Sequence, residues 1–235
     1  MLIEKSLMAT MNLKLIDGVH ILTLTNAENG GDNRLTTEVV AEYLTALDTV
    51  EQYRGNTALL LTCTHEKTFS TGINLDWLIP LNEADRNEFT TAFETLLCRL
   101  ALLNAPTVAC INGNAYAGGA IVASAADFRL MRSDRGRFCF PEVDIKIPFT
   151  QISSDIGQLL PNQQAVKNMM LTGIAYTGIE CAELQIVDAI YPQDQLQEEA
   201  LNLAKTLASK DRNTYCINRN LLRPAITAHL KNLTQ

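Results

Sequence analysis

The sequence lacks a long basic segment, and this absence argues against one large class of partners. Of its 235 residues, 19 are Lys or Arg and 26 are Asp or Glu, which gives a formal net charge of −7. Binding to nucleic acid depends mainly on Lys and Arg contacts to phosphates, and an acidic protein repels that polyanion. We therefore expect no nucleic-acid partner.

Motifs for metal binding and disulfide chemistry are also absent. The six cysteines form no C-x-x-C pair, and scattered thiols are typical of a reducing compartment, so we predict a cytoplasmic protein. The cysteines are Cys63, Cys98, Cys110, Cys139, Cys181 and Cys216. We expect Cys110 and Cys139 to pack in strands as small hydrophobes. His20, His65 and His229 have no acidic partner at a ligand spacing, so we predict structural or surface histidines and no metal site.

No targeting or membrane segment is evident. Residues 1–8 lack a basic start followed by a long apolar core, and the final residues do not form a peroxisomal signal. The segment 100–126 has no charged residue and is long enough to span a bilayer, but Asn104, Pro106 and Gly113 interrupt it. Such polar and broken positions would need partners inside the hydrocarbon. We therefore predict a buried strand, loop and helix, and no membrane partner.

Common nucleotide and hydrolase motifs are missing as well. The spacing of Gly113 and Gly118 matches the start of a phosphate-binding P-loop, but Gly119 and Ala120 stand where that motif needs Lys and Ser or Thr. The chain also contains neither a G-x-G-x-x-G segment after a predicted strand nor a G-x-S-x-G elbow. These patterns give no support to a dinucleotide cofactor or a serine nucleophile.

What is present is an alternation of strands and helices in a chain that is 47% hydrophobic, enough for one sizeable core. Asp17-Gly18 separates two short apolar segments, which predicts a hairpin. Periodicity predicts helices over 36–50, 83–103 and 120–126, and strands over 58–62, 107–111, 128–131 and 137–140. The order predicts an α/β fold whose core covers residues 1–190.

The last part of the chain is expected to be mostly helical and to belong to the same domain. We predict helices over 162–171, 193–209 and 213–230, with one strand over 186–190. Residues 191–235 therefore form a C-terminal helical region. An apolar stripe in its first helix, Leu196, Ala200, Leu203 and Leu207, fits either packing on the parent domain or a subunit interface.

Two glycine-containing segments carry the chemical information. They are Phe69–Asn74 and Ile111–Gly119, and Glu142 follows them along the chain. Glycine lets the backbone approach a ligand closely, so two such loops can supply two N–H donors to one developing negative oxygen. Glu142 is then a candidate base. On spacing alone a solvated strand carboxylate is the more common interpretation, with Asp144 on the same face.

The segments Phe69-Ser70-Thr71-Gly72 and Asn112-Gly113 through Gly118-Gly119 resemble those of the crotonase superfamily of enoyl-CoA hydratases and isomerases. The resemblance implies a spiral of repeated ββα units with a C-terminal helical region. It implies an acyl-CoA thioester substrate, no separate cofactor, an oxyanion hole formed by the N–H groups of Thr71 and Gly118, and a homotrimer or dimer of trimers assembled through the C-terminal helices. The substrate-binding residues that it implies are Ser70, Gly72, Ile73, Asn74, Leu75, Gly119, Ile121 and Phe149.

The number of glutamates then favours one reaction. The hydratases of this superfamily use two catalytic glutamates. At the position of the first glutamate this chain has Ile121, so only the second, Glu142, is retained. In this it is similar to the Δ3,Δ2-enoyl-CoA isomerases of fatty-acid metabolism. Moving a double bond needs one base to carry a proton from C2 to C4, whereas hydration needs proton transfer at both carbons. The alternatives are a 2-enoyl-CoA hydratase or another crotonase reaction, with Asp144 or another residue as the second proton-transfer group, and a non-catalytic acyl-CoA-binding protein.

Overall fold

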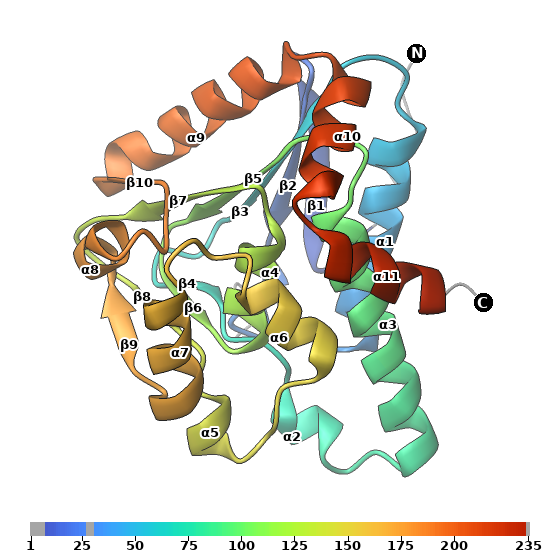
Figure 1. Ribbon diagram of the computed structural model, residues 1–235, viewed down its shortest axis with the longest axis vertical. Coiled ribbons are helices and arrows are strands. Elements are labelled where there is room, and N and C mark those ends of the chain that lie inside the picture. Colours follow the sequence, from blue (N-terminus) through green and yellow to red (C-terminus); the bar gives the residue numbers. More distant parts are fainter. Residues whose placement is uncertain (1–7, 27–30, 234–235) are drawn as a thin grey trace.

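The computed structural model describes residues 8–26 and 31–233. Two β-sheets occupy the centre of the molecule, and helices surround them (Figure 1). The expectations about targeting signals concern residues 1–7 and 234–235 in large part, and those residues lie outside the described ranges. The predicted α/β class is confirmed.

The larger sheet has six strands in the order β1-β2-β3-β5-β7-β10. Its strands are β1 (Met11–Ile16), β2 (Val19–Leu24), β3 (Ala58–Cys63), β5 (Thr107–Ile111), β7 (Phe128–Arg132) and β10 (Ala189–Tyr191). β1 and β2 form the predicted antiparallel hairpin, and the other neighbours are parallel. Asp17 and Gly18 both have positive φ, 50° and 79°, as a tight two-residue hairpin turn requires.

The smaller sheet has four short strands in the order β4-β6-β8-β9. They are β4 (Thr68–Ser70), β6 (Asn114–Tyr116), β8 (Arg137–Cys139) and β9 (Ala175–Thr177). Each pass of the chain adds one strand to each sheet: β3 then β4, β5 then β6, β7 then β8. This repeated pass confirms the predicted spiral of ββα units, although of these short strands the sequence analysis anticipated only β8.

Both faces of the larger sheet are covered. Along β3, Leu59 and Leu61 belong to one hydrophobic cluster, while Ala58 and Leu60 belong to a second one, so alternate side chains point to opposite faces. The helices of the first cluster include α1 (Thr37–Gln52), α3 (Glu83–Ala101) and α4 (Gly118–Ala125). The second cluster lies under α9 (Gln193–Ala208).

The position of helix α9 shows which of the two expectations for its apolar stripe holds, packing on the parent domain or a subunit interface. Leu196, Ala200 and Leu207 are buried against β2, β3, β5 and β7, together with Ala204. Leu203 is only partly buried. The stripe therefore packs on the sheet of its own chain, and α9 lies along that sheet (Figure 1).

The remaining helices are short. They are α2 (Leu75–Leu78), α5 (Glu142–Ile145), α6 (Gln151–Gly157), α7 (Gln163–Thr172), α8 (Gly178–Glu183), α10 (Arg212–Leu221) and α11 (Pro224–Leu233). The prediction of one helix over 213–230 was wrong, because two helices meet before Pro224. Proline lacks an N–H and disfavours helical backbone in the residue before it, so the first helix ends there. No helix of the described residues is long and apolar enough to cross a bilayer. The uncharged segment 100–126 contains the expected strand β5 and helix α4, and the short strand β6 lies in the expected loop between them.

Buried arginines hold the C-terminal helices to the core. Arg219 and Arg223 lie 3.6 and 3.0 Å from the carboxylate of Asp127, whose side chain is 4% exposed. Arg223 also donates to the carbonyls of Ala101 and Ala125, at the C-terminal ends of α3 and α4. The last carbonyls of a helix have no partner within it and carry its negative end, so these contacts satisfy both groups.

We predict that Asp127→Asn lowers the free energy of unfolding by about 3 kcal/mol, because it leaves two buried guanidinium groups without their counter-charge. Urea denaturation would measure this loss. The control is Lys205→Ala, which removes the exposed 2.8 Å ion pair with Asp17 and should cost less than about 1 kcal/mol. Equal losses in the two variants would contradict a structural role for the buried ion cluster.

Candidate active site

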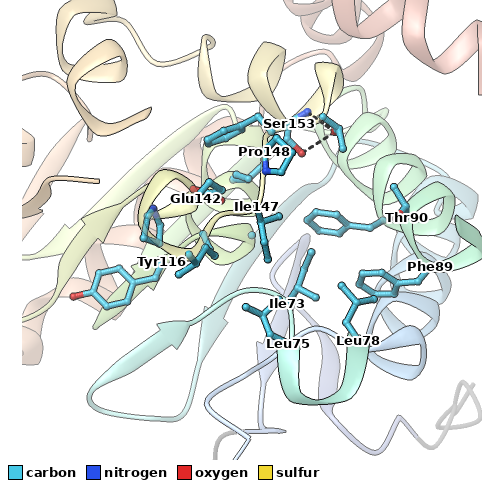
Figure 2. Close-up of a pocket in the computed structure, with 18 of the residues that line it drawn as sticks. Ile73, Leu75, Leu78, Phe89, Thr90, Tyr116, Glu142, Ile147, Pro148 and Ser153 are labelled. Carbon is cyan, nitrogen blue, oxygen red and sulfur yellow. Dashed lines mark hydrogen bonds between the residues drawn. The ribbon is translucent and has the colours of Figure 1, made fainter. Parts of the chain in front are cut away.

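A cavity of about 330 Å³ lies between four parts of the chain. They are the two glycine loops (the first over 69–74 and the second over 111–119), α3, and the segment from α5 to α6. Its wall is mainly apolar, and Figure 2 shows Ile73, Leu75 and Leu78 on one side and Ile147 and Pro148 on another. A concave, largely apolar pocket with a few polar groups is the usual form of a site for a small organic ligand.

The two glycine loops touch through their backbones. A Cβ atom added at Gly119 would lie 2.3 Å from the carbonyl oxygen of Ser70, and one added at Gly72 would lie 2.6 Å from the nitrogen of Gly118. Gly72 also has a φ of +83°, which L side chains rarely adopt. Only glycine at these positions lets the loops come this close.

The first loop offers one backbone donor, at a different residue from the one expected. The N–H of Thr71 donates to the carbonyl of Asp32 at 3.3 Å, and the N–H of Asn74 donates to Leu35 at 3.0 Å. The N–H of Gly72 donates to the hydroxyl of Ser70. Among the described residues the N–H of Ile73 makes no hydrogen bond. The structure therefore does not support Thr71 as a free donor, although its side chain lines the cavity.

The second loop offers the N–H of Gly118. Gly118 is the first residue of α4, where backbone N–H groups have no acceptor within the helix and the positive end of the dipole lies. Ala117, just before it, has φ +48° and ψ −129°, a strained conformation for a residue with a Cβ. This turn brings the chain from β6 into α4 at the cavity wall.

Glu142 is the buried carboxylate of the cavity. It is 7% exposed, and its Oε2 atom has no hydrogen-bond partner among the described residues. Burial raises its pKa from the usual 4.5 to about 7. Glu142 is the first residue of α5 and not part of a strand, so Asp144 does not lie on the same face as Glu142. Asp144 does not line the cavity and lies against Gly173 instead.

The other expected binding residues divide into two groups. Leu75, Ile121 and Phe149 line the cavity, as do Ile73 and Gly118. The remaining residues do not line it and hold the loops in place instead. Ser70 donates to the carbonyl of Asn33 at 2.8 Å, Asn74 caps α2, and Gly72 and Gly119 permit the loop contact.

Some lining residues were missed by sequence reasoning. They are Thr90 and Glu94 of α3, and Thr150 and Ser153 around the start of α6. A helical pattern predicts that Phe89 and Phe93 face the core, but nothing in the sequence shows that their polar neighbours face a cavity. That knowledge requires the position of α3 relative to α6.

The histidines and cysteines lie elsewhere, as predicted. His20 is buried, its Nδ1 lies 2.9 Å from the hydroxyl of Thr57, and burial is the main reason that its pKa falls to about 4. His229 pairs with Asp155 at 3.0 Å. Cys110 and Cys139 are buried in β5 and β8, and burial raises their thiol pKa values to about 12 and about 11. No group of metal-ligating side chains suited to an ion occurs within the described ranges.

Comparison with known proteins agrees with this fold. The family model of enoyl-CoA hydratase/isomerase matches residues 16–234, and the chain belongs to this crotonase family. Enoyl-CoA delta isomerase 3 of Arabidopsis thaliana is 28% identical over 214 residues, which cover 88% of this chain and 89% of that protein.

Solved structures of two proteins named for different reactions share the fold. Human mitochondrial delta3-delta2-enoyl-CoA isomerase matches with a TM-score of 0.85 and 23% identity, over 95% of this chain and 86% of that chain. Enoyl-CoA hydratase from Bacillus anthracis matches with a TM-score of 0.82 and 23% identity, over 96% and 87%. At this identity the likeness establishes the fold, and the reaction has to be argued from the site.

We predict that Gly119→Ala lowers the free energy of unfolding by about 3 kcal/mol, because its Cβ meets the backbone of Ser70. Gly118→Ala is the matched control, since the nearest atoms to its Cβ would be side-chain tips of Leu35 and Phe93 and the Cα of Gly72, all at 3.3–3.4 Å. Its loss should be below about 1 kcal/mol. Thermal or urea unfolding measures both, and similar losses would argue against the tight loop contact.

We predict a pH-dependent stability difference between wild type and Glu142→Gln. Because the folded-state pKa of Glu142 is raised from 4.5 to about 7, the folded protein binds a proton that the unfolded chain has released between these values. The wild type should therefore lose up to about 3 kcal/mol relative to the variant as the pH rises through 7. Urea unfolding at pH 5, 6, 7 and 8 measures the difference, and a constant difference would refute the raised pKa.

Proposed function

We propose that this protein is a Δ3,Δ2-enoyl-CoA isomerase, which moves the double bond of a 3-enoyl-CoA to the 2-position. The observation that carries the proposal is the buried carboxylate of Glu142, which lines the same cavity as Ile121. The site thus pairs one base with an inert side chain at the position where hydratases of the family carry a second glutamate. One base is sufficient for isomerisation.

The thioester oxygen of the substrate is proposed to accept hydrogen bonds from the N–H groups of Ile73 and Gly118. Both residues line the cavity, and the loop contact through Gly72 brings their backbones together. As the substrate loses a proton at C2, negative charge develops on this oxygen. Preorganised N–H donors and the positive end of α4 stabilise that charge, and each such donor contributes about 3 kcal/mol to lowering the barrier.

Glu142 is proposed to remove the C2 proton and to return it at C4. A carboxylate whose pKa is near 7 is a stronger base toward a carbon acid than an exposed glutamate, and it still ionises at neutral pH. After the first transfer the protonated Glu142 faces a dienolate. Protonation at C4 gives the conjugated 2-enoyl-CoA and regenerates the carboxylate.

The hydratase alternative is less well supported by the geometry. Hydration requires a second group for proton transfer, and Asp144, the candidate from the sequence, does not line the cavity. The other carboxylate that lines it, Glu94, belongs to α3 and not to the glycine loop that carries the family's second glutamate. Ile121 is 3% exposed and cannot transfer a proton. A non-catalytic acyl-CoA binder would use the glycine loops but would not need the buried charge of Glu142, whose burial costs stability.

A homotrimer or dimer of trimers is part of the same proposal. Helix α10 presents exposed apolar side chains at Ile217 and Leu221, and Leu222 follows them, with exposed fractions of 54%, 75% and 80%. Neighbouring exposed apolar side chains of this kind commonly form part of a subunit interface.

We predict that the protein converts a trans-3-enoyl-CoA to the 2-enoyl-CoA with little hydration of a trans-2-enoyl-CoA, and that Glu142→Gln lowers kcat at least a thousandfold. The amide cannot accept the C2 proton, while the binding surface keeps its shape. Chromatography of the products and calorimetry with a saturated acyl-CoA would measure turnover and binding. In the wild type, kcat/KM should rise with pH to a plateau, with an apparent pKa of about 7.

Asp144→Asn is the matched control, because it removes a carboxylate two residues away that does not line the cavity. It should keep activity within a few-fold of wild type. Activity of Glu142→Gln within tenfold of wild type would remove Glu142 from the mechanism. Hydration as fast as isomerisation would favour the hydratase, and binding without turnover would favour a non-catalytic role.

A further inference from the structure

The cavity has a polar side that the proposed chemistry does not use. Thr90 and Glu94 lie one helical turn apart on α3, and Thr150 and Ser153 lie at the start of α6. Helices α3 and α6 are in contact, so the four residues belong to one part of the wall. Figure 2 shows Thr90 across the cavity from Glu142. This part of the wall is here called the polar wall.

Glu94 is the feature of the polar wall that requires an explanation. It is half-buried, and within the described residues its carboxylate makes neither a hydrogen bond nor an ion pair. Most of the cavity around it is apolar, including Phe89 and Phe93 of the same helix. A carboxylate beside an apolar ligand loses water contacts without gaining a partner, which is unfavourable.

The hydrogen-bonding capacity of the polar wall is weighted toward acceptors. An ionised carboxylate such as that of Glu94 can only accept. The hydroxyl of Thr90 donates to the carbonyl of Arg86 at 2.8 Å, so the Thr90 hydroxyl can only accept a hydrogen bond from a ligand. The hydroxyls of Thr150 and Ser153 share a hydrogen bond of 3.1 Å, which occupies one donor. A ligand group that fits this wall should therefore donate.

We infer that the acyl group for which this cavity is suited carries a hydrogen-bond donor, such as a hydroxyl group, that is bound by Glu94. The inference rests on the proposed acyl-CoA function and specifies its substrate class. The thioester end lies at the glycine loops and the chain extends toward α3, where the donor replaces the water lost from the carboxylate. A plain alkyl chain of the same length leaves Glu94 desolvated and binds more weakly.

The experiment measures binding, so that it does not depend on turnover. Isothermal titration calorimetry would compare the saturated hexanoyl-, octanoyl- and decanoyl-CoA with their terminally hydroxylated counterparts. At the chain length that reaches Glu94, the wild type should bind the hydroxylated ligand about tenfold more tightly, as expected for a hydrogen bond to a charged acceptor. Glu94→Leu should abolish or reverse this preference, because it makes the wall apolar at nearly unchanged volume.

Two further variants make the test specific. Glu88→Leu makes the same substitution at an exposed position of α3 that does not line the cavity, and it should keep the wild-type preference. Glu94→Gln keeps an acceptor oxygen and should keep part of the preference. Circular dichroism melting of each variant checks that the fold is intact.

The outcomes separate this inference from the proposed function. If the wild type binds both members of every pair equally, or if Glu94→Leu keeps the preference, the inference on Glu94 is overturned while the acyl-CoA function stands. If no acyl-CoA binds at any chain length, the proposed function fails first and the inference fails with it.

Discussion

The site depends on one backbone-to-backbone contact between two loops that are distant in the sequence. Gly119 packs on the carbonyl of Ser70 and Gly72 packs on the nitrogen of Gly118, and neither contact leaves space for a Cβ atom. The two sheets support this contact, because β4 pairs with β6 directly before the loops. The spiral topology thus brings the backbones of the two loops into contact at the cavity wall.

The sequence was sufficient for the regular parts of the fold and for the general location of the site. The hairpin at Asp17-Gly18 and the helices with strong periodicity were predicted close to their observed bounds. Strands of three residues, such as β4 and β6, are too short to show a pattern, so the smaller sheet was largely missed. The proline at position 224 does indicate a helix boundary, but the apolar periodicity on both sides of it favoured one continuous helix.

Within the site, the error at Thr71 has a specific physical cause. Which N–H of the first loop remains free depends on the carbonyl of Asp32, a residue from a different segment with a φ of 46°. No local pattern shows that contact. The position of Glu142 on α5, facing the cavity, likewise follows from packing and not from alternation along a strand.

The buried ion cluster has a consequence for the order in which this protein can form during synthesis. Asp127 lies in the middle of the chain, whereas Arg219 and Arg223, which neutralise it, belong to the region around α10 and α11. Until that region has left the ribosome, the carboxylate lacks these two ion-pair partners, and the carbonyls of Ala101 and Ala125 lack the hydrogen bonds from Arg223. A nascent chain that stops before α10 therefore keeps an incompletely neutralised carboxylate at its centre and stays open to chaperones and proteases.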